Sequence, residues 1–130
     1  MSSETFLVRE EADLITLRRA IDARSIGIQM SLINRTKLMT VVNELGRNMI
    51  VYGGGGHVTV EMRQRGTQQG IQLTFTDQGR GIADMEAAMR DGYSTAGGLG
   101  VGLPGARRLM DEFSIDSVVG RGTTVRVTKW

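Results

Sequence analysis

The sequence of 130 residues has the size of one common domain, so we expect residues 1–130 to form a single unit. It contains no cysteine, which excludes disulfides and thiol catalysis, and its net charge of +2 is too small to indicate a nucleic-acid partner. No apolar run approaches the length of a membrane span and no signal-peptide pattern opens the chain, so we expect a cytoplasmic protein without a membrane partner.

The first part of the sequence predicts one strand and two helices. Residues 5–9 are typical of a short strand. Apolar residues recur at helical spacing in two stretches, which predicts helices over about 10–25 and about 31–52. The glycine run over 53–56 then ends the second helix.

The remaining sequence predicts two hairpins with helices between them. Alternating apolar residues over 58–62 and 71–75 indicate two strands, joined by a loop over 66–70. A short helix near 83–90, a helix from about Gly102, and strands over 113–119 and 123–128 follow. The whole pattern predicts an α+β fold in which helices cover one face of an antiparallel or mixed sheet.

Glu44 and Asn48 are the first pair of residues that indicate chemistry. They stand four residues apart on a predicted helix and therefore share one face. A carboxylate and an amide there can serve a nucleophile and a hydrated Mg²⁺ ion, which prefers oxygen ligands and keeps several waters. The alternative is an exposed polar pair that only stabilises its helix.

Asp77 closes a predicted strand and opens a turn that contains Gly79 and Gly81. A carboxylate at this point can accept a hydrogen bond from the exocyclic amine of adenine. The two glycines would let the backbone come close to a flat base. An ordinary turn is the alternative, because Asp and Gly favour turns for conformational reasons.

The stretch 97–105 is rich in glycine and leads into a predicted helix. Glycines leave backbone amides unobstructed, and the positive end of a following helix attracts phosphate. Pro104 fits the first turn of that helix, where no amide hydrogen is needed. The stretch matches neither a Walker loop nor a dinucleotide fingerprint, so a flexible connection remains the alternative to a phosphate cradle.

Together, these segments resemble the conserved boxes of the GHKL superfamily of ATPases and kinases, in the family's order. The N box, the two glycine boxes and the final Gly-Thr element correspond to residues 43–48, 77–81, 98–103 and 122–124. Residues 89–113 and 120–130 are in addition very similar to the stressosome switch serine/threonine kinases. The resemblance implies a Bergerat fold, which is a two-layer α/β sandwich with a mixed sheet and helices on one face.

The resemblance also implies ATP and Mg²⁺ as cofactors and a role for each motif residue. Asn48 would hold Mg²⁺, Glu44 would be the base that orients or deprotonates the substrate hydroxyl, and Asp77 would read adenine. Further nucleotide contacts would come from Gly79, Gly81, Gly98, Leu99, Gly100, Val101, Gly102, Leu103 and Thr123 or Thr124. One residue departs from the family: Gly46 replaces the usual alanine, and a glycine inside a helix costs ~1 kcal/mol relative to alanine.

The implied activity is phosphorylation of serine or threonine in STAS-domain partners that act as antagonist and scaffold. After release, such kinases activate a PP2C-type phosphatase. Two other kinds of family member are disfavoured. A histidine kinase would need a phosphoacceptor helix, and gyrase-, Hsp90- or MutL-like ATPases would need a transducer domain, and the sequence indicates neither. The enzymatic runner-up is an anti-sigma factor kinase that binds a sigma factor directly. The alternative from another class is a non-catalytic adaptor for which ATP is a conformational ligand.

Overall fold

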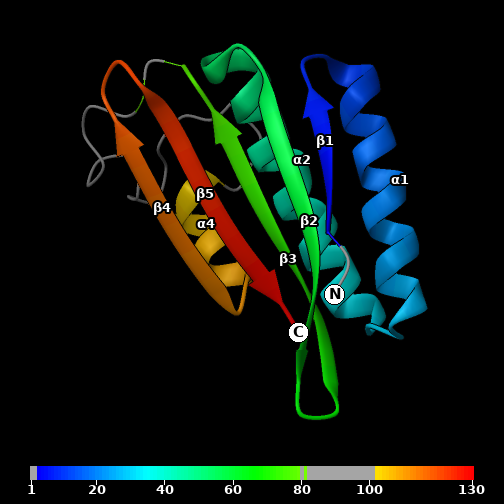
Figure 1. The fold of residues 1–130 in the computed structure, drawn as a ribbon. Helices are drawn as coiled ribbons and strands as arrows, with labels where there is room; N and C mark the ends of the chain where they lie inside the picture. The colour runs from blue at the N-terminus through cyan, green and yellow to red at the C-terminus, as the bar shows by residue number, and fades with distance from the viewer. Residues whose placement is uncertain (1–2, 80, 82–101) are drawn as a thin grey trace.

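The computed structural model describes residues 3–79, 81 and 102–130 of the chain (Figure 1). In these residues the elements follow the order β1 (Ser3–Val8), α1 (Glu11–Gly27), α2 (Leu32–Gly53), β2 (Gly56–Arg65), β3 (Gln68–Asp77), α4 (Gly102–Leu109), β4 (Glu112–Val118) and β5 (Gly122–Lys129). The predicted strands and the helices over 10–25, over 31–52 and from about Gly102 are confirmed, with ends that differ by at most three residues from those predicted. The helix expected near 83–90 lies outside the described residues.

The five described strands form one sheet in the order β1-β2-β3-β5-β4. Every neighbouring pair is antiparallel, so the mixed sheet implied by the family resemblance is wrong in that detail. The connections explain this result. The pairs β2–β3 and β4–β5 are hairpins. Two helices separate β1 from β2, so the chain reverses direction three times between these strands and β2 returns antiparallel to β1 (Figure 1).

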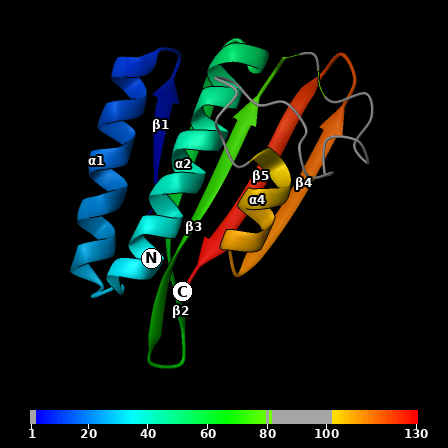
Figure 2. The ribbon, with the colours of Figure 1, turned by 180° about the vertical axis from the view of Figure 1, so that it is seen from behind.

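All three described helices lie on one face of the sheet, as the two opposite views show (Figures 1 and 2). The α+β two-layer class is therefore confirmed. The alternation of the strands explains the core, because Val58 lies opposite Phe75 and Val60 lies opposite Leu73, all on the helix-covered face. These four side chains are almost completely buried and pack with helix residues such as Leu14, Leu17, Leu38, Val42 and Leu45.

The ends of α2 follow ordinary capping chemistry. The side chain of Ser31 accepts the backbone N–H of Asn34 at 3.2 Å, which satisfies an otherwise unpaired amide of the first turn. Gly54 ends the helix in the left-handed conformation with φ 71°, where glycine is favoured. None of the described helices has the length and apolar character that crossing a bilayer requires.

The β2–β3 hairpin differs from the sequence prediction of a loop over 66–70. Arg65 pairs with Gln68 and Arg63 pairs with Gly70, so the turn consists of residues 66 and 67 alone. Gly70 belongs to the strand for a packing reason, since a Cβ there would lie 2.6 Å from ring atom Cε3 of Trp130. A glycine required for close packing was thus mistaken for a glycine required for a turn.

Candidate nucleotide-binding site

Asp77 ends the central strand β3 with its side chain on the helix-covered face, half-buried. Its Oδ1 accepts the backbone N–H of Gly79 at 2.9 Å, which fixes the orientation of the carboxylate. Oδ2 makes no hydrogen bond to any of the described residues, so it can accept a hydrogen bond from a ligand.

Glycines surround this carboxylate and allow α2 to approach it. A Cβ on Gly53, the last residue of α2, would lie 2.5 Å from Cγ of Asp77. A Cβ on Gly79 would lie 2.6 Å from Cα of Gly53, and one on Gly122 would collide with the carbonyl oxygen of Asp77. Side chains are therefore excluded at these three positions, and backbone packs closely around Asp77.

Sequence reasoning interpreted Gly53 only as part of a helix stop and so missed its place in the site. The sequence nevertheless contained a signal for this role. A left-handed helix end needs only one glycine, here Gly54, but the sequence has four in succession, so the others indicate a further requirement.

The structure separates the two threonines that the sequence left as alternatives. Thr123 pairs with Asp77 across β5 and β3, so their side chains share a face. Thr124 pairs with Thr76 and points to the opposite face of the sheet. Oγ of Ser117 lies 2.9 Å from Oγ1 of Thr123 and orients it, a contact that sequence reasoning missed because it depends on strand register.

The helix α4 begins at Gly102 as predicted, with φ 70° at that residue. It packs against α2, and its first residue points toward the same end of the molecule as the C-terminal end of α2 (Figure 2). Leu103 is 7% exposed and belongs to the core, so only its backbone is available to a ligand. The other members of the second glycine box, Gly98, Leu99, Gly100 and Val101, lie outside the described residues.

The remaining glycine of the first box, Gly81, has φ 74°, which favours glycine. A Cβ there would also collide with the carbonyl oxygen of Val118, at the end of β4. The first box is therefore held closely between the end of α2 and the turn that joins β4 and β5.

Glu44 and Asn48 lie on α2, behind the end that contacts Asp77. Glu44 is only 6% exposed and Asn48 is half-buried, so the alternative of an exposed surface pair does not describe them. With a rise of 1.5 Å per residue, Asn48 and Glu44 stand about 7 and 13 Å back from Gly53 along the helix axis. Asp77 on β3 therefore adjoins the C-terminal end of α2, and Asn48 and then Glu44 follow at increasing distance back along that helix. This order of predicted base reader, metal ligand and general base fits a nucleotide extended along the helix.

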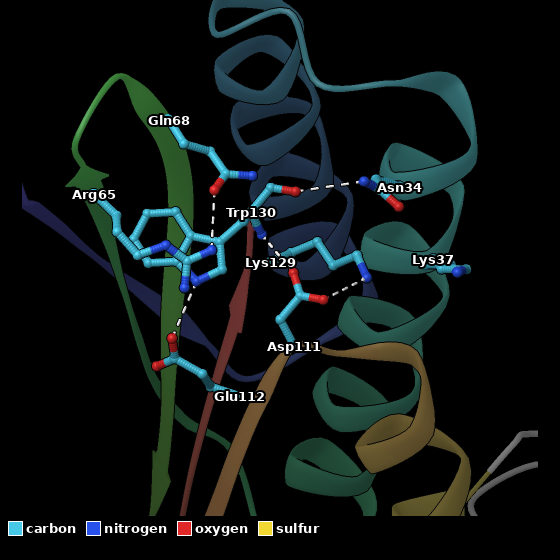
Figure 3. A pocket seen from close by; sticks show the side chains of 8 residues that line it. All are labelled: Asn34, Lys37, Arg65, Gln68, Asp111, Glu112, Lys129 and Trp130. Atoms are coloured by element: carbon cyan, nitrogen blue, oxygen red, sulfur yellow. Dashed lines mark hydrogen bonds and ion pairs between the residues drawn. The ribbon is translucent and has the colours of Figure 1, made fainter.

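A separate polar hollow of about 480 Å³ lies at the opposite end of the molecule (Figure 3). It is lined by Asn34, Lys37, Arg65, Gln68, Asp111, Glu112, Lys129 and Trp130, and none of the predicted site residues belongs to this set. Trp130 donates its backbone N–H to Asp111 at 2.8 Å and its indole N–H to Glu112 at 3.0 Å, while Arg65 stacks on its ring. These contacts fasten the end of the chain to the start of β4.

Comparison with known proteins shows the family. Residues 33–130 match the family described as histidine kinase-, DNA gyrase B-, and HSP90-like ATPase. The chain is 38% identical over 125 residues to the serine/threonine-protein kinase RsbT of Bacillus subtilis, covering 95% of this chain and 92% of that protein. It is 33% identical over 103 residues to the anti-sigma F factor of Bacillus subtilis, covering 72% of this chain and 68% of that protein.

The fold has a counterpart among solved structures. The crystal structure of the RsbU and RsbW domains of a Mycobacterium tuberculosis protein superposes on 99% of this chain with a TM-score of 0.69 and 17% sequence identity. The chain spans about a third, 32%, of that larger protein chain. The sequence matches identify the family, whereas the structural match, at 17% identity, shows only the fold. The chain belongs to the histidine kinase-, DNA gyrase B-, and HSP90-like ATPase family, and it is an enzyme of the serine/threonine-protein kinase type within that family.

Proposed function

We propose that this chain is an ATP- and Mg²⁺-dependent serine/threonine kinase of a bacterial stress-response partner-switching pathway of the stressosome type, acting in the cytoplasm. Its substrates would be STAS-domain antagonist and scaffold proteins, and after release it would activate a PP2C-type phosphatase. The observation that carries the proposal is that Asp77 of β3 adjoins the end of α2, with Asn48 and then Glu44 following back along that helix. This arrangement occurs in a chain that is similar over 95% of its length to a serine/threonine-protein kinase.

Asp77 would select adenine. Its Oδ1 accepts the backbone N–H of Gly79, which leaves Oδ2 to accept a hydrogen bond from the exocyclic amine of the base. Thr123 stands beside it on the same face and can add a second polar contact. The glycines Gly53 and Gly79 keep other side chains away from this carboxylate.

Asn48 would hold the metal ion through its side-chain oxygen, with the phosphates and water completing the ligand set. Bound Mg²⁺ would neutralise phosphate charge during the transfer. The N-terminal end of α4, which follows the second glycine box, would turn backbone amides toward the phosphates.

Glu44 would act on the substrate hydroxyl. It would accept the proton as the serine or threonine oxygen bonds to the γ-phosphorus, while the bond from that phosphorus to the β,γ-bridging oxygen breaks and ADP leaves. The new phosphate adds roughly −1.5 to −2 charges at pH 7. Such a charge weakens a packed interface, so the partner would dissociate and expose the kinase surface to the phosphatase.

The test uses the wild-type chain, Glu44→Gln and the matched control Glu61→Gln, whose carboxylate lies on the open face of the sheet. Each is incubated with Mg-ATP and a purified STAS-domain protein. Phosphosites are then mapped by mass spectrometry, and the complex is followed by gel filtration. We expect phosphoserine or phosphothreonine and loss of the complex with wild type and Glu61→Gln, but not with Glu44→Gln.

Two outcomes would replace the proposal by one of its alternatives. Direct binding of a sigma factor by the unmodified chain, with loss of that complex on adding the STAS protein, would assign it to the anti-sigma kinases. Equal partner binding by wild type and Glu44→Gln without any phosphorylated product, together with activation of a PP2C-type phosphatase, would make it an adaptor.

A further inference from the structure

Gly46 lies between the two N-box residues Glu44 and Asn48, and the structure shows why it is glycine. At 100° per residue, Gly46 is on the side of α2 roughly opposite to Glu44. It is buried against α1, where a Cβ would collide with Cδ1 of Leu14 and would lie 3.4 Å from its Cδ2. Leu14 is completely buried, so it has little free space into which to withdraw.

Two polar contacts flank this close packing and fix the same helix pair. Arg18, one turn beyond Leu14, donates from Nη1 to Oδ1 of Asn43 at 2.8 Å. On the other side, Glu11 and Arg47 approach to 4.0 Å, a weaker and more exposed pair. The side of α1 that carries residues 11, 14 and 18 therefore contacts α2 directly behind Glu44 and Asn48.

From these contacts we infer that Leu14 and Gly46 form a positioning contact for phosphoryl transfer. Leu14 occupies the space that a side chain at position 46 would need, and α1 thereby sets how far α2 projects toward the nucleotide. The inference rests on the proposed function for its kinetic consequence. A methyl group at position 46 would displace α2 and, with it, Glu44 and Asn48, whereas Asp77 is held separately by the end of β3.

Because a side chain at position 46 and the side chain of Leu14 compete for the same space, a smaller residue at position 14 should compensate for a larger one at position 46. Gly46→Ala adds one carbon. Leu14→Val gives a side chain that is one carbon smaller and that lacks the δ-methyl groups involved in the collision. The double variant therefore conserves volume, which cores tolerate best. Gly27→Ala is the matched glycine control because a Cβ there meets nothing within 4 Å, and Leu17→Val is the matched control for a fully buried leucine on α1.

Three quantities are measured for each variant: the single-turnover transfer rate to the STAS protein, the affinity for ATP with Mg²⁺ and with chelator, and the thermal unfolding temperature. For Gly46→Ala we expect a fall in transfer rate of about tenfold to hundredfold, since a displacement near 1 Å can cost about 10²-fold. The gain in ATP affinity that Mg²⁺ provides should shrink, while the affinity in chelator should stay within about threefold.

Adding Leu14→Val to Gly46→Ala should restore both the rate and the Mg²⁺-dependent affinity. Gly27→Ala and Leu17→Val should keep wild-type rates even where the unfolding temperature falls. A purely structural role predicts instead that the rate follows the unfolding temperature in all variants.

The inference is overturned if Gly46→Ala transfers phosphate at the wild-type rate, or if Leu14→Val does not restore the loss. A wild-type chain that phosphorylates no STAS protein would contradict the proposed function alone. The positioning contact would then be tested by the Mg²⁺-dependent part of the ATP affinity alone, which Gly46→Ala should lower and Leu14→Val should restore.

Discussion

Asp77 shows most directly how the position of one residue makes it a candidate for adenine binding. Its strand brings it to the helix-covered face, Gly79 occupies one carboxylate oxygen, and Gly53 and Gly122 keep side chains away. An aspartate followed by two glycines is common in turns, and only the approach of α2 distinguishes this one from an ordinary turn.

Asp77→Asn should weaken ATP binding by about tenfold to hundredfold, because the amide can place a donor where the adenine amine needs an acceptor, at a cost of ~1–3 kcal/mol. Asp116→Asn is the control, since Asp116 is exposed on β4 and pairs with Thr124. Calorimetry on both folded variants decides the assignment, and unchanged affinity in Asp77→Asn would remove Asp77 from the site.

Thr123 and Thr124 allow a second comparison of ATP affinity between single-residue variants. Thr123→Val removes a hydroxyl beside Asp77 and should weaken ATP binding about threefold to tenfold, the effect of one ordinary hydrogen bond. Thr124→Val makes the same chemical change on the opposite face and should leave the affinity unaltered. The measurement is the dissociation constant of each variant, and a larger loss in Thr124→Val would contradict the register of β5.

At the scale of the element, α2 joins all parts of the proposed mechanism. It carries Glu44 and Asn48, its last residue contacts Asp77, and α1 and α4 pack on its sides. Small changes along this helix should therefore alter binding and transfer separately, according to where on the axis they fall.

Gly53→Ala tests the adenine end of α2. Its Cβ would lie 2.5 Å from Cγ of Asp77, so we expect ATP affinity to fall about tenfold or more. Overpacking costs ~1–3 kcal/mol, but alanine gains ~1 kcal/mol over glycine in a helix, so the free energy of unfolding should change less than the binding does. Thermal unfolding and calorimetry measure the two effects. An affinity like that of wild type and Gly27→Ala would show that no close contact exists at Gly53.

At the scale of the whole molecule, the sequence predicted what depends on local chemistry. Helical spacing of apolar residues located α1 and α2, and the alternation of apolar residues located β2 and β3, whose Val58, Val60, Leu73 and Phe75 are buried. The order of the N box and glycine boxes indicated the family, because their combination is far more specific than each motif alone.

The features that the sequence did not predict depend on contacts between distant segments. The sequence left an antiparallel and a mixed sheet open, and the choice between them follows from how α1 and α2 return the chain. The short hairpin turn follows from the packing of Gly70 on Trp130. The choice of Thr123 over Thr124 needs the register of β5 on β3. The closeness of Leu14 to Gly46 likewise appears only when two helices are packed together.

In the proposed mechanism, α2 separates nucleotide binding from phosphoryl transfer along its axis. The decisive measurement is that of Mg-ATP affinity together with the single-turnover transfer rate in Glu44→Gln and Asn48→Ala. Glu44→Gln should bind Mg-ATP within about threefold of wild type but transfer phosphate about 10²–10⁴-fold more slowly, as expected for loss of a positioned base. Asn48→Ala should reduce both quantities. Transfer by Glu44→Gln at the wild-type rate would contradict the account.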